Sequence, residues 1–301
     1  MSRAKPPLVT LLLMVLPVVV LWGLNFAVIR TGVTSIGAFT LGAMRFAIAS
    51  LPFILFIRPP KVPVLFLAAY AAFFGLVQFG LLFLGMRLGL PSGLASLLLQ
   101  LQAVFTPVLA LLTLREPISR FTLGAIALSL LGLALILAAD SQGEASLVPL
   151  LLGIGAAASW ATSNVIIRFG ARQGYQYDSL ALVVWASLLL PVPFLILAGL
   201  SGELATVTRD SLIAALWPAI YLGLMATIIG YVLWVRALAT FDAATVAPFS
   251  LLIPVIGLSA GYLIFGEALS LAEAAGCALI IGGVLVHLAG TARRKPKPGQ
   301  G

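Results

Sequence analysis

Tryptophan, asparagine and serine side chains interrupt two otherwise apolar segments, and these residues have the clearest chemical potential in the chain. Near the start, Trp22 and Asn25 are three residues apart and so share one face of a helix. Trp160, Ser163 and Asn164 do the same in the middle. An asparagine facing lipid would leave its amide unpaired, so both amides are expected to point into a helix bundle. They would line a substrate pathway, or else only hydrogen-bond neighbouring helices.

Three further segments carry polar groups at helical spacing. Gln78 ends an aromatic stripe that includes Tyr70 and Phe74, Gln100 lies in the middle of the next apolar segment, and Tyr231 lies well inside a later one. We expect Gln78, Gln100 and Tyr231 to line the same cavity as the asparagines. The alternative is ordinary packing, because aromatic stripes commonly pack between helices and aromatic residues near span ends anchor at the membrane surface.

Prolines interrupt two of the apolar segments. Pro107 lies in the segment 91–114, and Pro248 and Pro254 lie in the segment 243–265. A proline inside a helix removes a backbone hydrogen bond and kinks the helix. These three prolines are therefore predicted to act as hinges when a transport pathway opens and closes.

Arg45 is the one charged residue in the middle of an apolar segment. An arginine at that depth costs roughly 2.5–3.5 kcal/mol on membrane-insertion scales, so it should face the bundle interior or reach a carbonyl partner. It would either bind a substrate carboxylate or clamp helices together, and the sequence leaves both roles open.

Acidic residues lie near the ends of apolar segments or between them, and the single His287 lies near the end of the last segment. Proton-coupled carriers usually keep a titratable group within the membrane, so transport without a carboxylate relay is predicted. Glu116 and Glu267 are expected to cap helix N-termini or to pair with Arg115 or Arg120. Because no metal-ligand cluster, phosphate loop or nucleophile–base pair stands out, we expect no enzyme activity, bound metal or cofactor.

Composition defines the setting of these residues. The chain has 301 residues, of which 62% are hydrophobic and 9% charged, and its mean hydropathy is +1.18. Soluble domains carry about 25% charged residues, so this chain is predicted to be an all-α integral membrane protein. Segments of about 20 apolar residues can span a bilayer. Ten such segments occur, at roughly 8–29, 36–57, 63–84, 91–114, 121–139, 147–167, 179–200, 211–235, 243–265 and 270–290.

The net charge of +8 is distributed in a way that favours membrane orientation over nucleic-acid binding. Basic residues concentrate in cytoplasmic loops of membrane proteins. With the amino terminus in the cytoplasm, few basic residues fall on the outside, and both termini are predicted to be cytoplasmic. The cytoplasmic set is Arg3, Lys5, Arg58, Lys61, Arg115, Arg120, Arg168, Arg172, Arg236, Arg293, Arg294, Lys295 and Lys297, and the outer set is Arg30, Arg87 and Arg209.

The chain also repeats itself. Eight residues separate Trp22 from Arg30, and eight separate Trp160 from Arg168. Five apolar segments precede the polar stretch 140–146 and five follow it, and an odd number of crossings per copy inverts the second copy in the membrane. The predicted organisation is a first five-helix repeat at 1–139, an inter-repeat loop at 140–146, an inverted second repeat at 147–290 and a basic cytoplasmic tail at 291–301.

These features resemble the drug/metabolite transporter superfamily, in particular its ten-helix branch with paired EamA-type repeats. The residues that carry the resemblance are the Trp-x-x-Asn start, Arg45, the run from Pro254 to Gly266-Glu267 and the glycine-rich segment 276–283. The first half departs from the pattern, since Ala103 precedes Glu116 where Pro254 precedes Glu267. Arg45 also lacks a basic counterpart, its place being taken by residues around 183–185.

The resemblance implies alternating access between two inverted repeats in a bacterial inner membrane. Within the branch, the chain looks most like the YddG-type exporters of aromatic and other neutral amino acids, which implies such substrates and a lipid bilayer as partners. The alternatives are a multidrug or nucleotide-sugar carrier of the same superfamily and, from another class, a membrane scaffold without transport. The oligomeric state, the exact substrate and the coupling remain open at this point.

Overall fold

The computed structural model describes residues 8–116, 118, 120–140, 147–240, 246, 249–250 and 252–292. Within these ranges the chain is helical apart from short turns, and no strand occurs. The fold is therefore an all-α bundle, as the apolar segments predicted.

The first half begins with α1 (Leu8–Ile36) and α2 (Ala38–Ser50). Two composite helices follow, each interrupted by a short turn of different helical geometry, and a long single helix ends the half. These elements are α3 (Val64–Ala71), the π-helical η1 (Ala72–Val77) and α4 (Gln78–Arg87), then α5 (Ser92–Leu98), the 3₁₀ turn η2 (Leu99–Leu101) and α6 (Gln102–Leu114), then α7 (Arg120–Asp140).

The second half follows a similar order. Its elements are α8 (Leu147–Arg172), α9 (Ser179–Leu188), α10 (Pro191–Leu200), the 3₁₀ turn η3 (Glu203–Thr206), α11 (Arg209–Ile220), the π-helical η4 (Tyr221–Ile229), α12 (Gly230–Thr240), α14 (Leu252–Phe265) and α15 (Leu271–Ala292). The π-helical turns η1 and η4 thus occur in corresponding helices of the two halves.

Six helical stretches of the described chain are long and apolar enough to cross a membrane. They are Val9–Ile36, Val64–Arg87, Ser92–Leu114, Leu147–Arg172, Ser179–Leu200 and Arg209–Trp234. Shorter apolar helices cover Ala38–Ser50, Arg120–Leu135, Leu252–Phe265 and Leu271–Val286. Large apolar side chains cover much of the outside, including Leu13, Phe56, Leu200 and Leu263, which is the surface that lipid requires.

The second apolar segment folds differently from the expectation of a helix over 36–57. α2 ends at Ser50, and the chain continues in hydrogen-bonded turns to Ile57. Pro52 has no backbone N–H to donate, which interrupts the α-helical pattern at this point. At its start α2 is capped from a distance, because the Glu203 carboxylate accepts bonds from the backbone amides of residues 38, 39 and 40.

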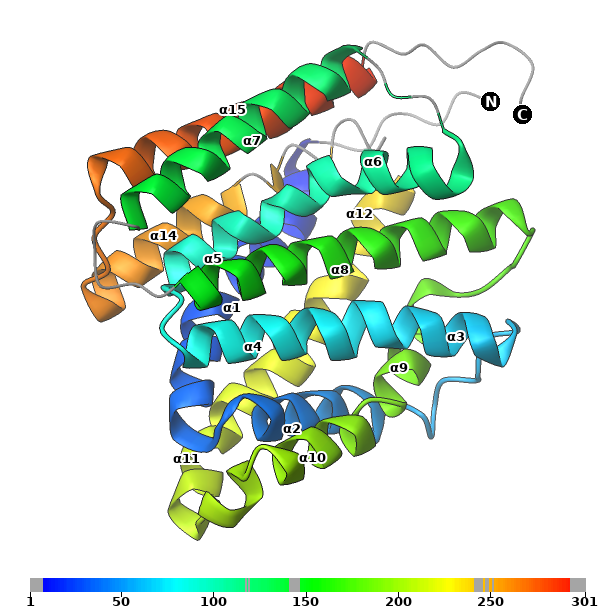
Figure 1. The fold of residues 1–301 in the computed structure, drawn as a ribbon. Helices are drawn as coiled ribbons and strands as arrows, with labels where there is room; N and C mark the ends of the chain where they lie inside the picture. Colours follow the sequence, from blue (N-terminus) through cyan, green and yellow to red (C-terminus); the bar gives the residue numbers. More distant parts are fainter. Residues whose placement is uncertain are drawn as a thin grey trace.

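The helices pack in layers, with elements from both halves in contact throughout (Figure 1). The last helices of the two halves, α7 and α15, lie side by side on one face of the bundle, and α2 and α10 pack together on the other. Between them α4 packs on α8, and α1 packs on α14. The buried core lies among these central helices.

Candidate substrate cavity

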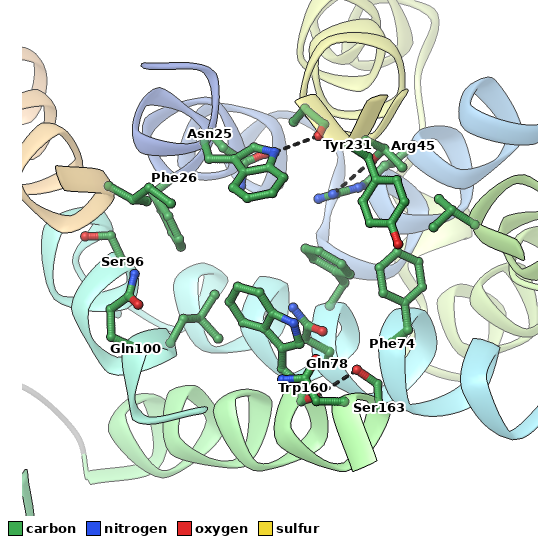
Figure 2. A pocket seen from close by; sticks show the side chains of 18 of the residues that line it. Asn25, Phe26, Arg45, Phe74, Gln78, Ser96, Gln100, Trp160, Ser163 and Tyr231 are labelled. Atoms are coloured by element: carbon green, nitrogen blue, oxygen red, sulfur yellow. Dashed lines mark hydrogen bonds between the residues drawn. The ribbon is translucent and has the colours of Figure 1, made fainter. Parts of the chain in front are cut away.

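A cavity of about 270 Å³ lies in the centre of the bundle (Figure 2). Its size is close to the lower end of the range of about 300–1,000 Å³ typical of small-molecule sites. Aromatic and aliphatic side chains form most of its wall, with a few amides, hydroxyls and one guanidinium. The lining residues are Trp22, Asn25, Phe26, Arg45, Tyr70, Phe74, Gln78, Phe79, Ser96, Leu99, Gln100, Trp160, Ser163, Asn164, Ile167, Val183, Ala226, Thr227, Tyr231 and Ile253.

The structure brings together all the side chains that the sequence put forward for a substrate site. The eight residues Trp22, Asn25, Gln78, Gln100, Trp160, Ser163, Asn164 and Tyr231 line this one cavity. Asn25 and Phe26 approach it from α1, and Trp160 and Ser163 approach it from α8 on the opposite side (Figure 2). The cavity is therefore built jointly by the two halves of the chain.

Of the three prolines named as hinges, Pro107 and Pro254 do not line the cavity. Pro107 lies within α6, just after the 3₁₀ turn η2, and Pro254 is buried near the start of α14. Pro248 lies outside the described residues. A hinge role for Pro107 and Pro254 remains a prediction.

Trp22 joins the first helix to the third helix of the other half. Its indole Nε1 donates a hydrogen bond of 2.9 Å to the carbonyl oxygen of Ala226, which lies in the π-helical turn η4. Its ring also lies 5.5 Å, centroid to centroid, from Trp234. Gly230 makes room for the indole, because a Cβ there would lie 2.6 Å from Nε1. The indole is thus held in place by a backbone group, with its ring facing the cavity.

A similar hydrogen bond runs from the first helix of the second half to the third helix of the first half. Ser159, next to Trp160 on α8, donates a 2.7 Å hydrogen bond to the carbonyl oxygen of Phe73 in the π-helical turn η1. Each half therefore uses its first helix to hold a π-helical turn of the other half. Such turns shift backbone bonding to i→i+5 and are frequent at functional sites. Sequence reasoning missed both turns, since their residues are ordinary apolar helix formers.

The two asparagines lie in different environments. The Asn164 side chain donates to Gln102 Oε1 at 2.8 Å and to Thr106 Oγ1 at 3.3 Å, so its amide is tied to α6. Asn25 is 8% exposed, and its Oδ1 has no hydrogen-bond partner. On the far wall, Gln78 is 3% exposed and its Oε1 likewise has none. Two buried acceptor oxygens without a hydrogen-bond partner thus belong to residues of the cavity wall.

An aromatic wall completes the cavity near Gln78. The Tyr70 and Phe74 rings stack with their centroids 4.9 Å apart and their planes 10° apart. The hydroxyls of Tyr70 and Tyr231 lie close together, which brings α3 and α12 to the same wall of the cavity. These rings provide flat apolar surfaces beside the polar groups.

Arg45 enters this wall from α2 and is 4% exposed. Its Nη2 donates a 3.0 Å hydrogen bond to Thr227 Oγ1, which in turn donates to the Leu222 carbonyl at 2.8 Å. The guanidinium carbon lies 3.8 Å from the centroid of the Phe79 ring. The expectation of a bundle-facing arginine is met, although its partner is a hydroxyl and not a carbonyl.

Ion pairs lie at opposite ends of the bundle. At one end, Arg30 pairs with Glu267, whose carboxylate also accepts from the Ser92 amide at 2.8 Å, the Ser92 hydroxyl at 2.9 Å and the Gly93 amide at 3.0 Å. Glu267 therefore caps α5, a helix of the other half. This agrees with the capping role expected for Glu267, while its basic partner was not foreseen.

At the other end, Glu116 pairs with Arg168 at 3.1 Å and with Arg172 at 2.9 Å. The expectation of a pair with Arg115 or Arg120 was therefore wrong. The physical reason is that Arg115 has a left-handed backbone at the end of α6, with φ of 55°, and the turn there brings Glu116 against the end of α8. Arg30 and Arg168, which hold the same place in the two repeats, thus each form an ion pair with a glutamate of the opposite half.

A multi-pass apolar bundle that encloses a partly polar cavity between two similar halves has the architecture of a membrane transporter. The chain belongs to the EamA-like transporter family, whose profile matches residues 9–138 and again residues 147–289. The drug/metabolite transporter resemblance seen in the sequence is thereby confirmed.

Relatives extend over nearly the whole chain. A protein of Salmonella typhimurium named "Probable amino-acid metabolite efflux pump" is 36% identical over 278 residues, 91% of this chain and 93% of that protein. A protein of Escherichia coli K12 with the same name is 33% identical over 92% of this chain and 94% of that protein. A "Probable terminal-alkyne amino-acid exporter" of Streptantibioticus cattleyicolor is 26% identical over 94% and 95%, respectively.

A crystal structure with 20% sequence identity superposes with a TM-score of 0.55 and covers 97% of this chain and 100% of that chain. At this level of identity the likeness concerns the fold alone.

Proposed function

We propose that this protein exports neutral amino acids, aromatic ones included, across a bacterial inner membrane by alternating access. In this proposal ten membrane-spanning helices form two inverted five-helix repeats, with both termini in the cytoplasm. The observation that carries the proposal is the central cavity, where aromatic rings and amides from both halves converge. The names of the relatives support the substrate class, and the double match of the family profile supports the two-repeat organisation.

The chemistry of the cavity suits an amphipathic zwitterion. The faces of Trp22, Trp160 and Tyr231 can stack against a flat or apolar side chain. Amides such as Asn25 and Gln78 can bind charged groups of the substrate without a fixed counter-charge of their own. The volume of about 270 Å³ accommodates a single small metabolite and little more.

The ion pairs at the two ends support alternating access. Arg30 and Glu267 bind α1 and α5 to the loop after α14 at one end, and Glu116 binds the end of α8 at the other. In an alternating cycle one such set opens while the other stays closed, so the cavity faces one side of the membrane at a time.

The test is counterflow in proteoliposomes, with phenylalanine and threonine as substrates. Trp22→Ala and Tyr231→Ala remove cavity walls, and we expect each to lower the exchange of phenylalanine by about tenfold or more, the loss that one aromatic contact of about 1.5 kcal/mol implies. Asn164→Ala is expected to impair both substrates, because it frees α8 from α6 beside the cavity.

Matched controls use the same residue types on the outside of the bundle. Trp217 is 53% exposed and Tyr262 is 63% exposed, and neither lines the cavity. Trp217→Ala and Tyr262→Ala should exchange substrate at the wild-type rate. If the three cavity variants transported as well as these controls, the site would be wrong. If wild-type protein exchanged no amino acid, the substrate class would be wrong.

A further inference from the structure

We propose that Arg45 is the carboxylate-binding residue of the cavity, and that Asn25 and Gln78 receive the substrate's ammonium group. The transported molecule would then be recognised by its free α-carboxylate more than by its side chain. This inference rests on the proposed function, namely that the cavity carries a small amino acid, and adds which atoms select that class of substrate.

The first observation is that the Arg45 guanidinium is buried and mostly unpaired. A guanidinium has five N–H donors, and the bond from Nη2 to Thr227 uses one of them. Nε and Nη1 have no hydrogen-bond partner. The guanidinium has two edges with paired donors, one formed by Nε and Nη2 and the other by Nη1 and Nη2. Since Thr227 takes only one N–H of Nη2, the other N–H of Nη2 still forms a pair of parallel donors with Nε or with Nη1. Two parallel donors are the geometry that binds both oxygens of a carboxylate.

The second observation is that nothing in the described structure neutralises this charge. The ion pairs of the described residues join Arg30, Arg168 and Arg172 to glutamates, and none involves Arg45. The Phe79 ring, 3.8 Å from the guanidinium carbon, stabilises a cation but accepts no strong hydrogen bond. A buried charge without a counter-ion is costly, and intramembrane arginines typically mark a substrate or ion pathway. Arg45 belongs to the wall of the cavity, and Figure 2 shows its side chain among the residues that line it.

The third observation is that the unsatisfied atoms of the cavity complement one another. Besides the two Arg45 nitrogens, the described residues leave buried side-chain atoms unpaired at Asn25 Oδ1, Gln78 Oε1, Ser129 Oγ and Ser187 Oγ. Asn25 and Gln78 are residues of the cavity wall, whereas Ser129 and Ser187 are not. The cavity thus offers one cationic donor and two neutral acceptors, which is the complement of a zwitterion with one carboxylate and one ammonium.

The asymmetry between the halves supports a single anion site. The place that corresponds to Arg45 in the second half falls around residues 183–185, where no basic residue occurs, and Val183 of this stretch lines the cavity. A symmetric pair of arginines would suit a substrate with two negative charges. One arginine matches the one carboxylate of a neutral amino acid, and Gln78 Oε1, which has no hydrogen-bond partner, can accept from the ammonium.

The alternative role is a structural clamp between α2 and η4 through Thr227. The two roles differ in what they predict for ligands. A clamp lowers stability or transport of every substrate equally, whereas a carboxylate site discriminates among analogues of one side chain.

The experiment is competition against phenylalanine counterflow by analogues that each lack one charged group. Phenyllactate keeps the carboxylate without the ammonium, and phenylalaninamide and phenethylamine lack the carboxylate. For wild-type protein we expect the two analogues without carboxylate to compete roughly 10- to 100-fold more weakly than phenylalanine, the range expected for loss of charge-assisted hydrogen bonds. Phenyllactate should compete more strongly than either.

Arg45→Gln should reduce competition by phenylalanine to the level of phenylalaninamide, and Arg45→Lys should restore part of the preference. The matched control is Arg87→Gln, since Arg87 lies at the end of α4 and does not line the cavity. Its preference should equal that of wild-type protein. Should Arg45→Gln fail to fold, the wild-type analogue series and Arg45→Lys still decide the matter.

Equal competition by phenylalanine and phenylalaninamide in wild-type protein would overturn the inference while leaving amino-acid transport intact. A preference for carboxylate that persists unchanged in Arg45→Gln would overturn the assignment to this residue. Absence of any amino-acid counterflow in wild-type protein would instead count against the proposed function, so the two failures are distinguishable.

Discussion

Glu267→Gln should open one end of the bundle, because this carboxylate holds three elements together. Four donors converge on it, from Arg30, the Ser92 amide, the Ser92 hydroxyl and the Gly93 amide. Hydrogen bonds to charged groups contribute about 1.5–3 kcal/mol each, against about 0.5–1.5 kcal/mol for neutral ones. Glutamine keeps one acceptor oxygen and turns an NH₂ group toward these donors.

The closed state of this end should therefore lose roughly 2–4 kcal/mol after allowing for the partial exposure of Arg30, which shifts the closed-to-open ratio by roughly 30- to 1,000-fold. Replacing four charged hydrogen bonds by neutral ones costs about 1–1.5 kcal/mol per bond, or about 4–6 kcal/mol in all, and the side-chain exposures of 35% for Arg30 and 12% for Glu267 reduce this to roughly 2–4 kcal/mol. The shift is large enough to appear as a change in labelling rate.

The assay is cysteine labelling, which is simple here because the chain has a single cysteine to remove. Cys277→Ala gives a cysteine-free background, and Gln100→Cys places one thiol in the cavity wall. A membrane-impermeant maleimide is then added to intact cells or to inverted vesicles. Glu267→Gln should accelerate labelling from the outer side by at least about tenfold, given the shift above. Glu116→Gln, at the other end, should accelerate labelling from the cytoplasmic side.

The control is Glu273→Gln, which makes the same change six residues further along. Glu273 accepts from the Ser270 amide at the start of α15, and no ion pair of the described residues joins it to another helix. Its labelling rates should match those of the parent protein. Unchanged labelling in Glu267→Gln, or an equal increase from both sides of the membrane, would refute the idea that this contact closes one end.

Two further predictions concern stability, measured as the unfolding midpoint in detergent. Gly283→Ala should destabilise the protein by about 1–3 kcal/mol, because the added Cβ would lie 2.5 Å from Ser129 Oγ and 2.8 Å from the Ala125 carbonyl oxygen. The control is Gly282→Ala, whose added Cβ meets nothing within 4 Å and which should be neutral or slightly stabilising. Equal midpoints for the two variants would contradict the close packing of α7 on α15. Ser159→Ala should cost about 0.6–2 kcal/mol by leaving the Phe73 carbonyl unpaired, while Thr162→Val, which removes only a bond within α8, should cost less. An equal loss in both would mean that the bond to η1 contributes little.

The position of the cavity residues could be predicted from the sequence, because helical periodicity and the cost of a lipid-facing amide are local rules. Trp22 and Asn25 had to share a face, and Asn164 had to point inward. The same rules predicted the approximate positions of the helices. They failed to predict the end of α2 at Ser50, because the apolar composition continues past Pro52 to residue 57.

Long-range partners could not be predicted, because nothing in the local pattern encodes them. Arg30 and Glu267 are 237 residues apart, and Arg45 and Thr227 are 182 residues apart. For Glu116 the arginines nearest in sequence were the natural choice, and the turn after α6 directs its carboxylate elsewhere. The π-helical turns also escaped prediction, since a change of backbone bonding leaves no mark on composition.

The reciprocal bonds from Trp22 to η4 and from Ser159 to η1 bear on which parts of the molecule can move as units. Each bond ties the first helix of one half to the third helix of the other. Glu267 adds another such tie, from the loop after α14 to α5. The two halves of the chain are therefore bonded to one another at several places. Rotation of either half as a rigid body would break these hydrogen bonds. We therefore expect α1 to move together with η4, and α8 to move together with η1. Cutting the chain within 140–146 would consequently separate α1 from η4 and α8 from η1, so each fragment would keep only one member of each pair.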